Sequence, residues 1–487
     1  MQATFLLRRV GSFFAALDDR LSRYRLLIGG AIALLLSGGF ALMSVFAGPI
    51  YNLNDIGTFK IRALFIVMTA TVYALLLIVT AALHRGSVYR MLLRQLIVTA
   101  GLMILLMGIN QKTFFYNESI QPLIRAMDAG GLGAAAGWET NLSAPAMTLL
   151  YLITRGSVYD MYSVKLLCIG CFLLLCLLTA RMADRKDMGL RADALLALCV
   201  ILPQGFMSFG CTGLLDVVCV ALLAAALALA LGGEGRIAMR AAAAMYGFAL
   251  SMSGLALYAL PVFALLAANR RMSARELAAA LAIPVLACVP AMLSGMPAGE
   301  ALLSLLRANL SLPEYAAGAP GLLSLIPRAE VTEMPIIWWL ERLPEYDAAT
   351  NAQPYYTQEH FEIAALGISV SGIAIYGGVC AWLWQKNDMS KTAKAFALTL
   401  SALIVCPGIT NGAWIAAGLL SLYAIFADKA LRLPACMVLF AASCAAVYPM
   451  TEEILLPLAA AFALCLCALL MATGILPTTI HPEESDG

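Results

Sequence analysis

The chain has 487 residues, of which 62% are hydrophobic and 12% charged, with a formal net charge of +2 and a mean hydropathy of +0.87. Soluble domains carry about 25% charged residues, so this composition excludes an ordinary soluble protein and predicts a polytopic membrane protein in a lipid bilayer. The small net charge gives no indication of a nucleic-acid partner, and we expect none.

Residues 1–25 place apolar and arginine side chains at helical spacing, which predicts an interfacial amphipathic helix leading into a signal anchor. Apolar runs of about 20 residues, long enough to cross a bilayer, follow along the chain. With shorter, interrupted runs they predict an all-α bundle of about 12–14 transmembrane helices. The long runs lie near 26–47, 62–84, 91–109, 160–181, 191–209, 213–232, 275–295, 363–385 and 453–473.

The basic residues predict the orientation. With a cytoplasmic N-terminus, alternating spans place most of the 31 lysines and arginines on cytoplasmic turns, as the positive-inside rule requires. We therefore expect a plasma-membrane protein with both termini in the cytoplasm. The predicted parts are 1–109 (amphipathic helix and three spans), 110–159 (first extracytoplasmic loop, with short membrane-parallel helices), 160–295 (transmembrane bundle), 296–362 (second extracytoplasmic loop) and 363–487 (C-terminal spans and a short cytoplasmic tail).

The 13 cysteines are scattered through apolar stretches and the three histidines lie far apart. This pattern predicts buried, reduced thiols rather than a disulfide framework or a metal site. No glycine-rich phosphate loop follows a strand pattern, so neither a nucleotide site nor a metal site is evident, and we expect no ATP-driven transport by this chain alone.

Several short motifs follow one another between residues 110 and 475. They are 121–125, 140–145, 162–167, 213–216, 249–251 with Pro261, and Pro407. In order and spacing they resemble the polytopic GT-C glycosyltransferases, nearest to bacterial relatives of the mannosyltransferase that adds the second mannose of GPI anchors. The resemblance implies a GT-C-like bundle that transfers a sugar from a polyprenyl-phosphate donor to a glycan or lipid acceptor at the outer face, in cell-envelope glycan or glycolipid assembly.

Some positions depart from the family's pattern. The family places a general-base aspartate seven residues before the loop proline, Pro122, where this chain has Phe115. Phe172 replaces an acidic residue seven positions after Lys165, and 407–414 lacks the histidine, glutamate and arginine of the family's last motif. The scaffold is therefore easier to recognise than the chemistry.

Sugar transfer needs a carboxylate that takes the proton of the acceptor hydroxyl and cations that balance the leaving phosphate. In the first loop, Glu118 is the best candidate base and Asp128 a weaker one, and the alternative for both is a solvated loop carboxylate. Lys112 and Arg125 are candidate phosphate ligands, and their alternative is snorkelling at the interface.

Lys165 and Asp216 each lie one turn inside the outer end of an apolar span, where an unpaired charge is costly. They either line a substrate cavity or pair across helices. Trp338 and Trp339 in the second loop either stack on sugar rings or belong to the interfacial aromatic belt. Arg94 lies near a cytoplasmic end and is expected to snorkel.

Two further functions fit the same features. One is a catalytically inactive GT-C-fold subunit or scaffold that joins a membrane partner subunit in an envelope-glycan complex. The other is a transporter of lipid-linked saccharides, which is disfavoured because polar residues within the spans are few and no two-half repeat is evident.

Overall fold

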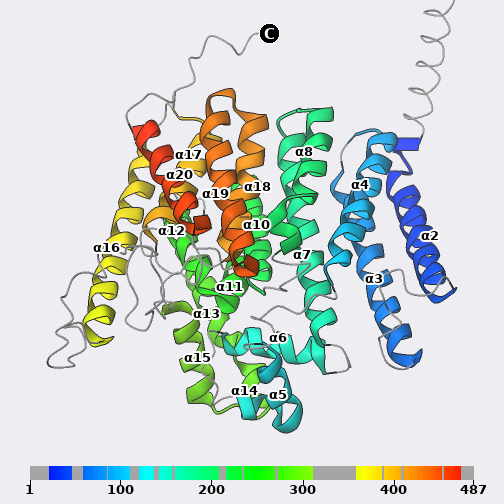
Figure 1. The fold of residues 1–487 in the computed structure, drawn as a ribbon, viewed down its shortest axis with the longest axis horizontal. Helices are drawn as coiled ribbons and strands as arrows, with labels where there is room; N and C mark the ends of the chain where they lie inside the picture. The colour runs from blue at the N-terminus through cyan, green and yellow to red at the C-terminus, as the bar shows by residue number, and fades with distance from the viewer. Residues whose placement is uncertain are drawn as a thin grey trace, which may run out of the picture. The chain divides into compact units, whose positions relative to one another are not determined.

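The computed structural model describes residues 21–46, 59–84, 86–109, 120–135, 142–155, 160–207, 215–232, 235–268, 272–310, 358–386, 389–406, 411–451 and 455–472. These residues are helical and contain no strand (Figure 1), which confirms the all-α prediction for the described part of the chain. The chain forms two compact units, and each consists of two stretches of sequence. Unit 1 is 1–116 with 153–213, and unit 2 is 117–152 with 214–487.

Within the described ranges, six helices are long and apolar enough to cross a bilayer. They are Arg25–Ser44, Ala63–Leu83, Val88–Met107, Met161–Asp184, Ala274–Leu293 and Lys429–Val447. Five shorter apolar helices accompany them: Ala144–Thr154, Asp216–Ala230, Gly254–Ala267, Gly412–Ala427 and Ala459–Met471. The protein is therefore a multi-pass helical membrane protein by length and composition of its helices.

Unit 1 contains the helices of its two stretches of sequence. They are α2 (Arg25–Phe46), α3 (Phe59–Leu83), α4 (Val88–Met107), α7 (Asp160–Asp184), α8 (Leu190–Val200) and α9 (Pro203–Gly205). Helices α3 and α4 of the first stretch pack against α7 and α8 of the second. The predicted span 191–209 is interrupted, because α8 ends at Val200 and Pro203 starts a new short helix. Proline has no N–H for the preceding turn, so a continuous helix cannot pass through this position without losing a hydrogen bond.

Unit 2 contains the remaining helices. They are α5 (Gln121–Ala134), α6 (Ala144–Thr154), α10 (Asp216–Gly232), α11 (Arg236–Met252), η5 (Gly254–Ala259), α12 (Leu260–Ala268), α13 (Ala274–Ala287), α14 (Val289–Leu293), α15 (Ala298–Leu310), α16 (Gln358–Gln385), α17 (Lys391–Val405), α18 (Asn411–Ala427), η8 (Lys429–Leu431), α19 (Arg432–Thr451) and α20 (Leu455–Ala472). The last five α-helices share an apolar core around Tyr376, Phe396, Leu400 and Trp414.

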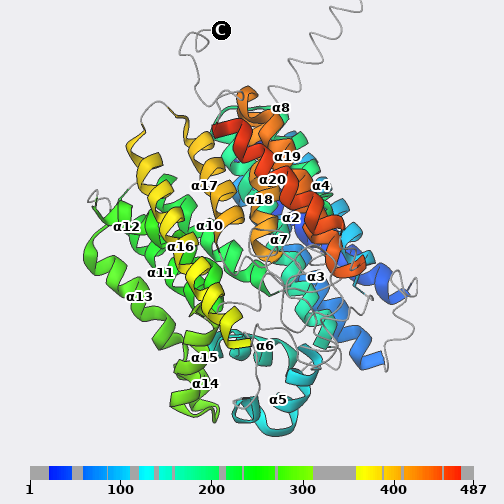
Figure 2. The same cartoon turned by 60° about the vertical axis from the view of Figure 1, so that its left-hand side comes forward.

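The two loop segments contain short amphipathic helices, as their sequences predict. In the first loop, α5 buries Leu123, Ile124 and Met127 and leaves its opposite face exposed. In the second, α15 forms the described part that follows α14. Figures 1 and 2 show α5 beside α14 at one end of unit 2, and a Cβ on Gly133 would lie 2.7 Å from the carbonyl oxygen of Gly295. These loop helices are thus packed parts of unit 2.

The described cysteines are free, which agrees with the prediction of reduced thiols. Most are buried, and Cys436 and Cys465 are the exposed exceptions among them.

Candidate functional site

A break between α11 and α12 is the centre of the candidate site in unit 2. α11 ends at Met252, and Ser253 has extended backbone angles of φ −158° and ψ 149°. A 3₁₀ turn follows from Gly254, and Pro261 lies in the first turn of α12. A proline in the first turn of a helix costs no hydrogen bond, because the N–H groups there have no partner within the helix. In the middle of one continuous helix the same proline would remove a hydrogen bond. The break therefore leaves backbone groups that must find partners outside their own helix.

Side chains from distant parts of the sequence provide those partners. The Ser143 hydroxyl donates to the carbonyl oxygen of Ser251 at 2.5 Å. The Cys219 thiol lies 3.5 Å from the carbonyl oxygen of Ala249 and 3.8 Å from that of Ser253. Thus α10 and the start of α6 both contact carbonyls at the break, and the carbonyls of Ala249 and Ser253 also accept from backbone N–H groups.

Ser143 also holds the start of α6. Its hydroxyl oxygen accepts from the backbone N–H of Ala146 at 3.2 Å, the usual geometry of an N-cap. The preceding donor in the same turn, the N–H of Ala144, bonds to the Ser304 hydroxyl at 2.9 Å. Ser143 and Ser251 are fully buried, so these bonds tie the first loop, the break and α15 together away from solvent.

Asp216 is the first residue of α10, where the helix dipole favours a negative charge. The α-carbon of Gly412 approaches it closely: a Cβ on Gly412 would lie 2.7 Å from the Cβ of Asp216 and 3.1 Å from a methyl carbon of Leu255. Gly412 belongs to the first turn of α18. Hence α10, η5 and α18 meet at Asp216, and this contact needs a residue without a side chain at position 412. We call Ser143, Asp216, Ser251, Ser253 and Gly412 the unit 2 junction.

The other predicted site residues of unit 2 lie elsewhere or outside the described part. Arg125 and Asp128 are both exposed, one helical turn apart on α5. Glu118, Lys112, Trp338 and Trp339 lie outside the described residues, so their roles stay predictions.

Lys165, in α7 of unit 1, has structural partners. Its side chain is fully buried, and Nζ lies 3.1 Å from the carbonyl oxygen of Ile109 and 3.4 Å from that of Gly108. These carbonyls follow the last turn of α4, where a helix is stabilised by a cation. Lys165 therefore caps α4 at the point where the chain leaves it for the first loop.

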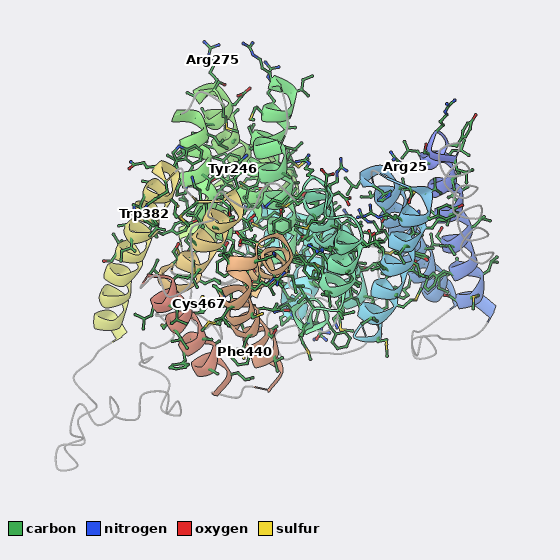
Figure 3. All side chains as sticks on the ribbon, turned by 90° about the horizontal axis from the view of Figure 1, so that it is seen from above. Arg25, Tyr246, Arg275, Trp382, Phe440 and Cys467 are labelled. Atoms are coloured by element: carbon green, nitrogen blue, oxygen red, sulfur yellow. The ribbon has the colours of Figure 1, made fainter. Side chains whose placement is uncertain are left out.

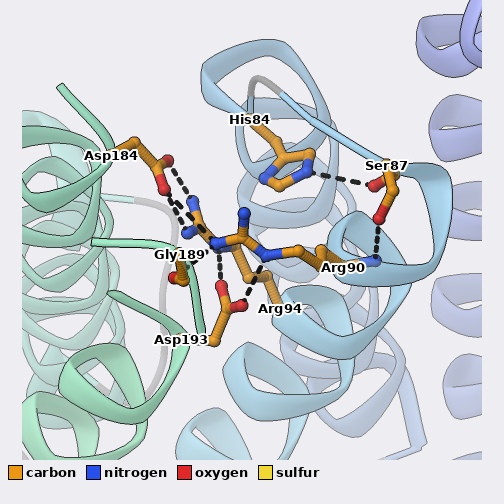
Figure 4. A network of polar contacts seen from close by, with 7 residues as sticks. All are labelled: His84, Ser87, Arg90, Arg94, Asp184, Gly189 and Asp193. Carbon is orange, nitrogen blue, oxygen red and sulfur yellow. Dashed lines mark hydrogen bonds and ion pairs between the residues drawn. The ribbon is translucent and has the colours of Figure 1, made fainter. Parts of the chain in front are cut away.

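Unit 1 also contains a buried network of four charges (Figure 4). Arg94 donates two bonds to Asp184, at 2.6 and 2.7 Å, and one to Asp193 at 2.5 Å. Arg90 donates to the other oxygen of Asp193 at 2.7 Å and to the carbonyl oxygen of Gly189 at 2.7 Å. The Arg94 and Asp193 side chains are each 3% exposed. The prediction that Arg94 snorkels is wrong, because two carboxylates from α7 and α8 hold its guanidinium inside the unit.

His84 lies beside this network, at the end of α3. Its ring is 1% exposed, and Nε2 lies 3.1 Å from the carbonyl oxygen of Ser87. Burial, with the positive charge of Arg94 nearby, lowers the pKa of His84 to about 4. The ring is therefore neutral at pH 7, with Nε2 as the donor, since a carbonyl oxygen only accepts.

Sequence reasoning missed Ser143, Ser251 and Gly412 as functional positions, although motifs 140–145, 249–251 and 407–414 contain or adjoin them. A serine two residues before a proline, at the start of an apolar run, is a recognisable N-cap signal. No sequence signal indicates the contact between Gly412 and Asp216, because these residues lie almost 200 positions apart in the chain. Among the described residues, no three histidine, cysteine, aspartate or glutamate side chains gather as a metal ion would require.

Comparisons with known proteins found no match among family models, curated proteins or solved structures.

Proposed function

We propose that this protein is a GT-C-like membrane glycosyltransferase of the hexosyl or mannosyl type, which uses a polyprenyl-phosphate sugar at the outer face of the membrane. The observation that carries the proposal is the unit 2 junction. Three of the segments that resemble the family meet there, through the Ser143–Ser251 bond and the contact between Asp216 and Gly412. Segments with a shared catalytic purpose are expected to converge in this way.

The junction also has features that a polar substrate site in a membrane needs. A broken helix within a bilayer is tolerated where protein or a wet cavity surrounds it. At the break a hydroxyl and a thiol group contact backbone carbonyls, and Asp216 supplies a carboxylate beside the first turns of α10 and α18. In this proposal Asp216 orients the sugar, and a second carboxylate takes the proton from the acceptor hydroxyl.

The proposed base is Glu118, with Asp128 as the weaker candidate. Asp128 lies on the exposed face of α5, one turn from Arg125, so the pair is accessible to an acceptor or to a lipid phosphate. Lys112 and Arg125 balance the charge of the leaving phosphate, and Trp338 and Trp339 stack on the sugar. With about 12–14 spans, both termini in the cytoplasm and the plasma membrane as its location, the first loop faces the lipid-linked donor.

Sugar transfer by purified protein tests the proposal. Wild-type protein in liposomes is given radiolabelled polyprenyl-phosphate mannose or glucose with membrane glycolipid acceptors, and we expect labelled product. Glu118→Gln should lower the rate by about 10²–10⁴-fold, the range for a positioned acid–base group. Asp216→Asn should lower the rate as well, because the sugar loses the carboxylate that orients it. Asp187→Asn is the matched control: it removes an exposed carboxylate in unit 1 and should leave the rate unchanged.

A second candidate function is an inactive GT-C-fold subunit of an envelope-glycan complex. The observation that favours it is Phe115, which stands where the family has its aspartate. Absence of transfer with every donor, together with binding of the lipid-linked sugar that Asp216→Asn weakens, would support this function. Movement of the lipid-linked sugar across proteoliposomes without transfer would instead support a transporter.

A further inference from the structure

Helices α11 and α13 of unit 2 run in the same direction. Near their first turns, Arg240 Nε lies 3.7 Å from Glu276 Oε1. Farther along both helices, a Cβ on Gly247 would lie 2.6 Å from the carbonyl oxygen of Ala280 and 2.7 Å from the Cβ of Ile283. The contacts advance together along both helices, so α11 and α13 are parallel, and η5 and α12 return the chain from the end of α11 to the start of α13. Figure 2 shows α11, α12 and α13 on one side of unit 2. Their N-termini, the positive ends of both dipoles, lie at the same end.

This shared end carries an excess of cations. Arg236 and Arg240 occupy the first two turns of α11, which has no acidic residue in its first turn. Arg275 lies in the first turn of α13 and projects outward from the helices (Figure 3). A cation at a helix N-terminus is unfavourable, because it adds to the positive end of the dipole. Three arginines therefore give this end a positive charge.

The described residues at this end offer one carboxylate in return. Glu276 is already engaged, since its Oε2 accepts from the N–H of Ser273 at 2.9 Å in a capping box. Arg240, its ion-pair partner, is 70% exposed. Glu234, Arg270 and Arg271 belong to the adjoining connections and lie outside the described residues. The exposed guanidinium groups thus have room and charge for an additional anion.

Beyond the arginines, each of the two helices has a row of exposed apolar side chains along its length, which we call its apolar stripe. On α13 the stripe continues from Arg275 at helical spacing, and the span Ala274–Leu293 has only 22% of its apolar window buried. On α11 the stripe follows Arg236. The exposed large side chains of the two stripes are Ile237, Met245 and Phe248 on α11, Leu281, Val285 and Leu286 on α13, and Val289 at the start of α14.

We propose that this end of α11 and α13 binds an anionic phospholipid. The headgroup phosphate contacts Arg236, Arg240 and Arg275, and the acyl chains lie along the apolar stripes. Arginine favours this ligand because its planar donors match phosphate oxygens, and nearby basic residues are attracted to anionic lipids. A lipid fits better than a free phosphate, because the arginines adjoin the exposed apolar stripes, which the acyl chains of a lipid would cover.

Helices α16 and α17 supply an internal comparison. They are joined by a short connection, and Gly372 in α16 approaches Val405 at the far end of α17, so these helices are antiparallel. Lys391 and Lys394 lie at the start of α17, beside the negative C-terminal end of α16. Asp428, which accepts from Ser390 at 3.2 Å, adds a carboxylate there. The lysine pair therefore has fewer cations with a carboxylate beside them, and lysine lacks the planar donors of arginine, so it should bind an anionic lipid less well.

The test measures how lipids change the thermal stability of full-length protein in a neutral detergent. We expect phosphatidylglycerol, but not phosphatidylcholine or inorganic phosphate, to raise the Tm of the wild-type protein. Arg236→Gln with Arg240→Gln should weaken the apparent phosphatidylglycerol affinity roughly 30-fold, since each basic side chain near an anionic lipid contributes about 1 kcal/mol and 1.4 kcal/mol is about tenfold. Arg275→Gln alone should weaken it about fivefold.

Lys391→Gln with Lys394→Gln is the matched control and should bind phosphatidylglycerol like the wild type. Arg275 is exposed and makes no described ion pair, so Arg275→Gln provides a readout even if the double arginine variant does not fold. Equal loss in the lysine variant, an unchanged affinity in Arg275→Gln, or equal protection by inorganic phosphate would each overturn the proposal. Native mass spectrometry of the bound lipid counts the molecules retained by each variant.

Discussion

The buried charge network of unit 1 and the unit 2 junction use opposite means to join distant segments. In unit 1, two arginines and two aspartates hold α4, α7 and α8 together with charge-assisted bonds of 2.5–2.7 Å. In unit 2, the junction depends on single hydroxyl and thiol groups and on a glycine contact. Both carboxylates of the network accept hydrogen bonds from arginine. The junction, by contrast, surrounds the break between α11 and α12.

This difference suggests a division of roles. A closed set of buried ion pairs fixes geometry, because removing any member leaves a charge without its partner. A broken helix with neutral capping groups leaves more freedom for a substrate to enter and leave. We therefore regard unit 1 as the rigid part and the unit 2 junction as the functional part. Four predictions follow from this comparison, and each changes one of the two regions.

The largest effect is expected from Arg94→Ala. Because this change leaves Asp184 and Asp193 buried beside a single arginine, it should lower the free energy of unfolding by about 3–5 kcal/mol. Arg94→Lys should restore little, since lysine cannot form the paired bonds to Asp184. Thermal unfolding in detergent measures both, with the exposed Arg185→Ala as control. A wild-type Tm for Arg94→Ala would contradict the rigid role of the network.

Gly412→Ala tests the close approach at the junction. The added methyl group would meet the Cβ of Asp216 at 2.7 Å, an atom too near the backbone to move aside easily. We expect a loss of about 3 kcal/mol, at the upper end of the usual cost of overpacking. Gly378→Ala is the control, because a Cβ there would contact nothing within 4 Å. Equal stability of the two variants would show that α10 and α18 do not meet as described.

A smaller effect, confined to acid, is expected from His84. Its folded pKa of about 4 lies below the unfolded value of about 6.5, so the unfolded chain binds the proton first. The stability contributed by the neutral ring is present above pH 6.5 and is lost as the pH falls toward 4. At pH 5 the loss is on the order of 2 kcal/mol.

His84→Gln removes this titration but keeps a polar side chain. The difference in Tm between wild type and variant, followed from pH 7.5 to pH 5 by steps of about half a unit, isolates the histidine from the carboxylates that titrate in both proteins. A difference that stays constant over this range would refute the assignment of a neutral, buried ring.

Ser143→Ala should have the smallest effect, a loss of about 1 kcal/mol. The change removes an N-cap and leaves the buried carbonyl oxygen of Ser251 without the Ser143 hydroxyl. Ser401→Ala is matched, because the Ser401 hydroxyl bonds only within its own helix, to Leu398 at 2.9 Å. Chemical unfolding of both variants measures the difference. Equal values would mean that the junction adds no stability beyond that of an ordinary helical serine.

The helical character and the loop helices could be predicted from the sequence because they depend on local signals. Apolar runs, amphipathic spacing in α5 and α15, and the break beside Pro261 are all readable within a few residues. The intramembrane position of Lys165 and Asp216 was readable for the same reason. Their partners were not, since a lone charge in an apolar run does not tell which helix will face it.

Arg94 illustrates the limit most clearly. Near the end of a span, arginine ordinarily extends to the interface, and nothing within one turn indicates otherwise. Its partners Asp184 and Asp193 lie about 90 and 99 residues away, and the sequence shows them as charges on a polar turn. Only the packing of α4 against α7 and α8 makes the pairing inevitable. Likewise, the resemblance to GT-C enzymes gave the order of the motifs along the chain, but it did not indicate which motifs contact one another in the folded protein.

The most direct test of the central claim is photo-crosslinking of a polyprenyl-phosphate sugar that carries a photoreactive group on its sugar ring. The account predicts that adducts fall on peptides of the unit 2 junction, around Ser143, Asp216, Ser253 or Gly412. It also predicts that unlabelled donor competes and that Asp216→Asn reduces the yield. Adducts confined to unit 1, or a yield that neither competitor nor Asp216→Asn changes, would contradict the assignment of the junction as the sugar site.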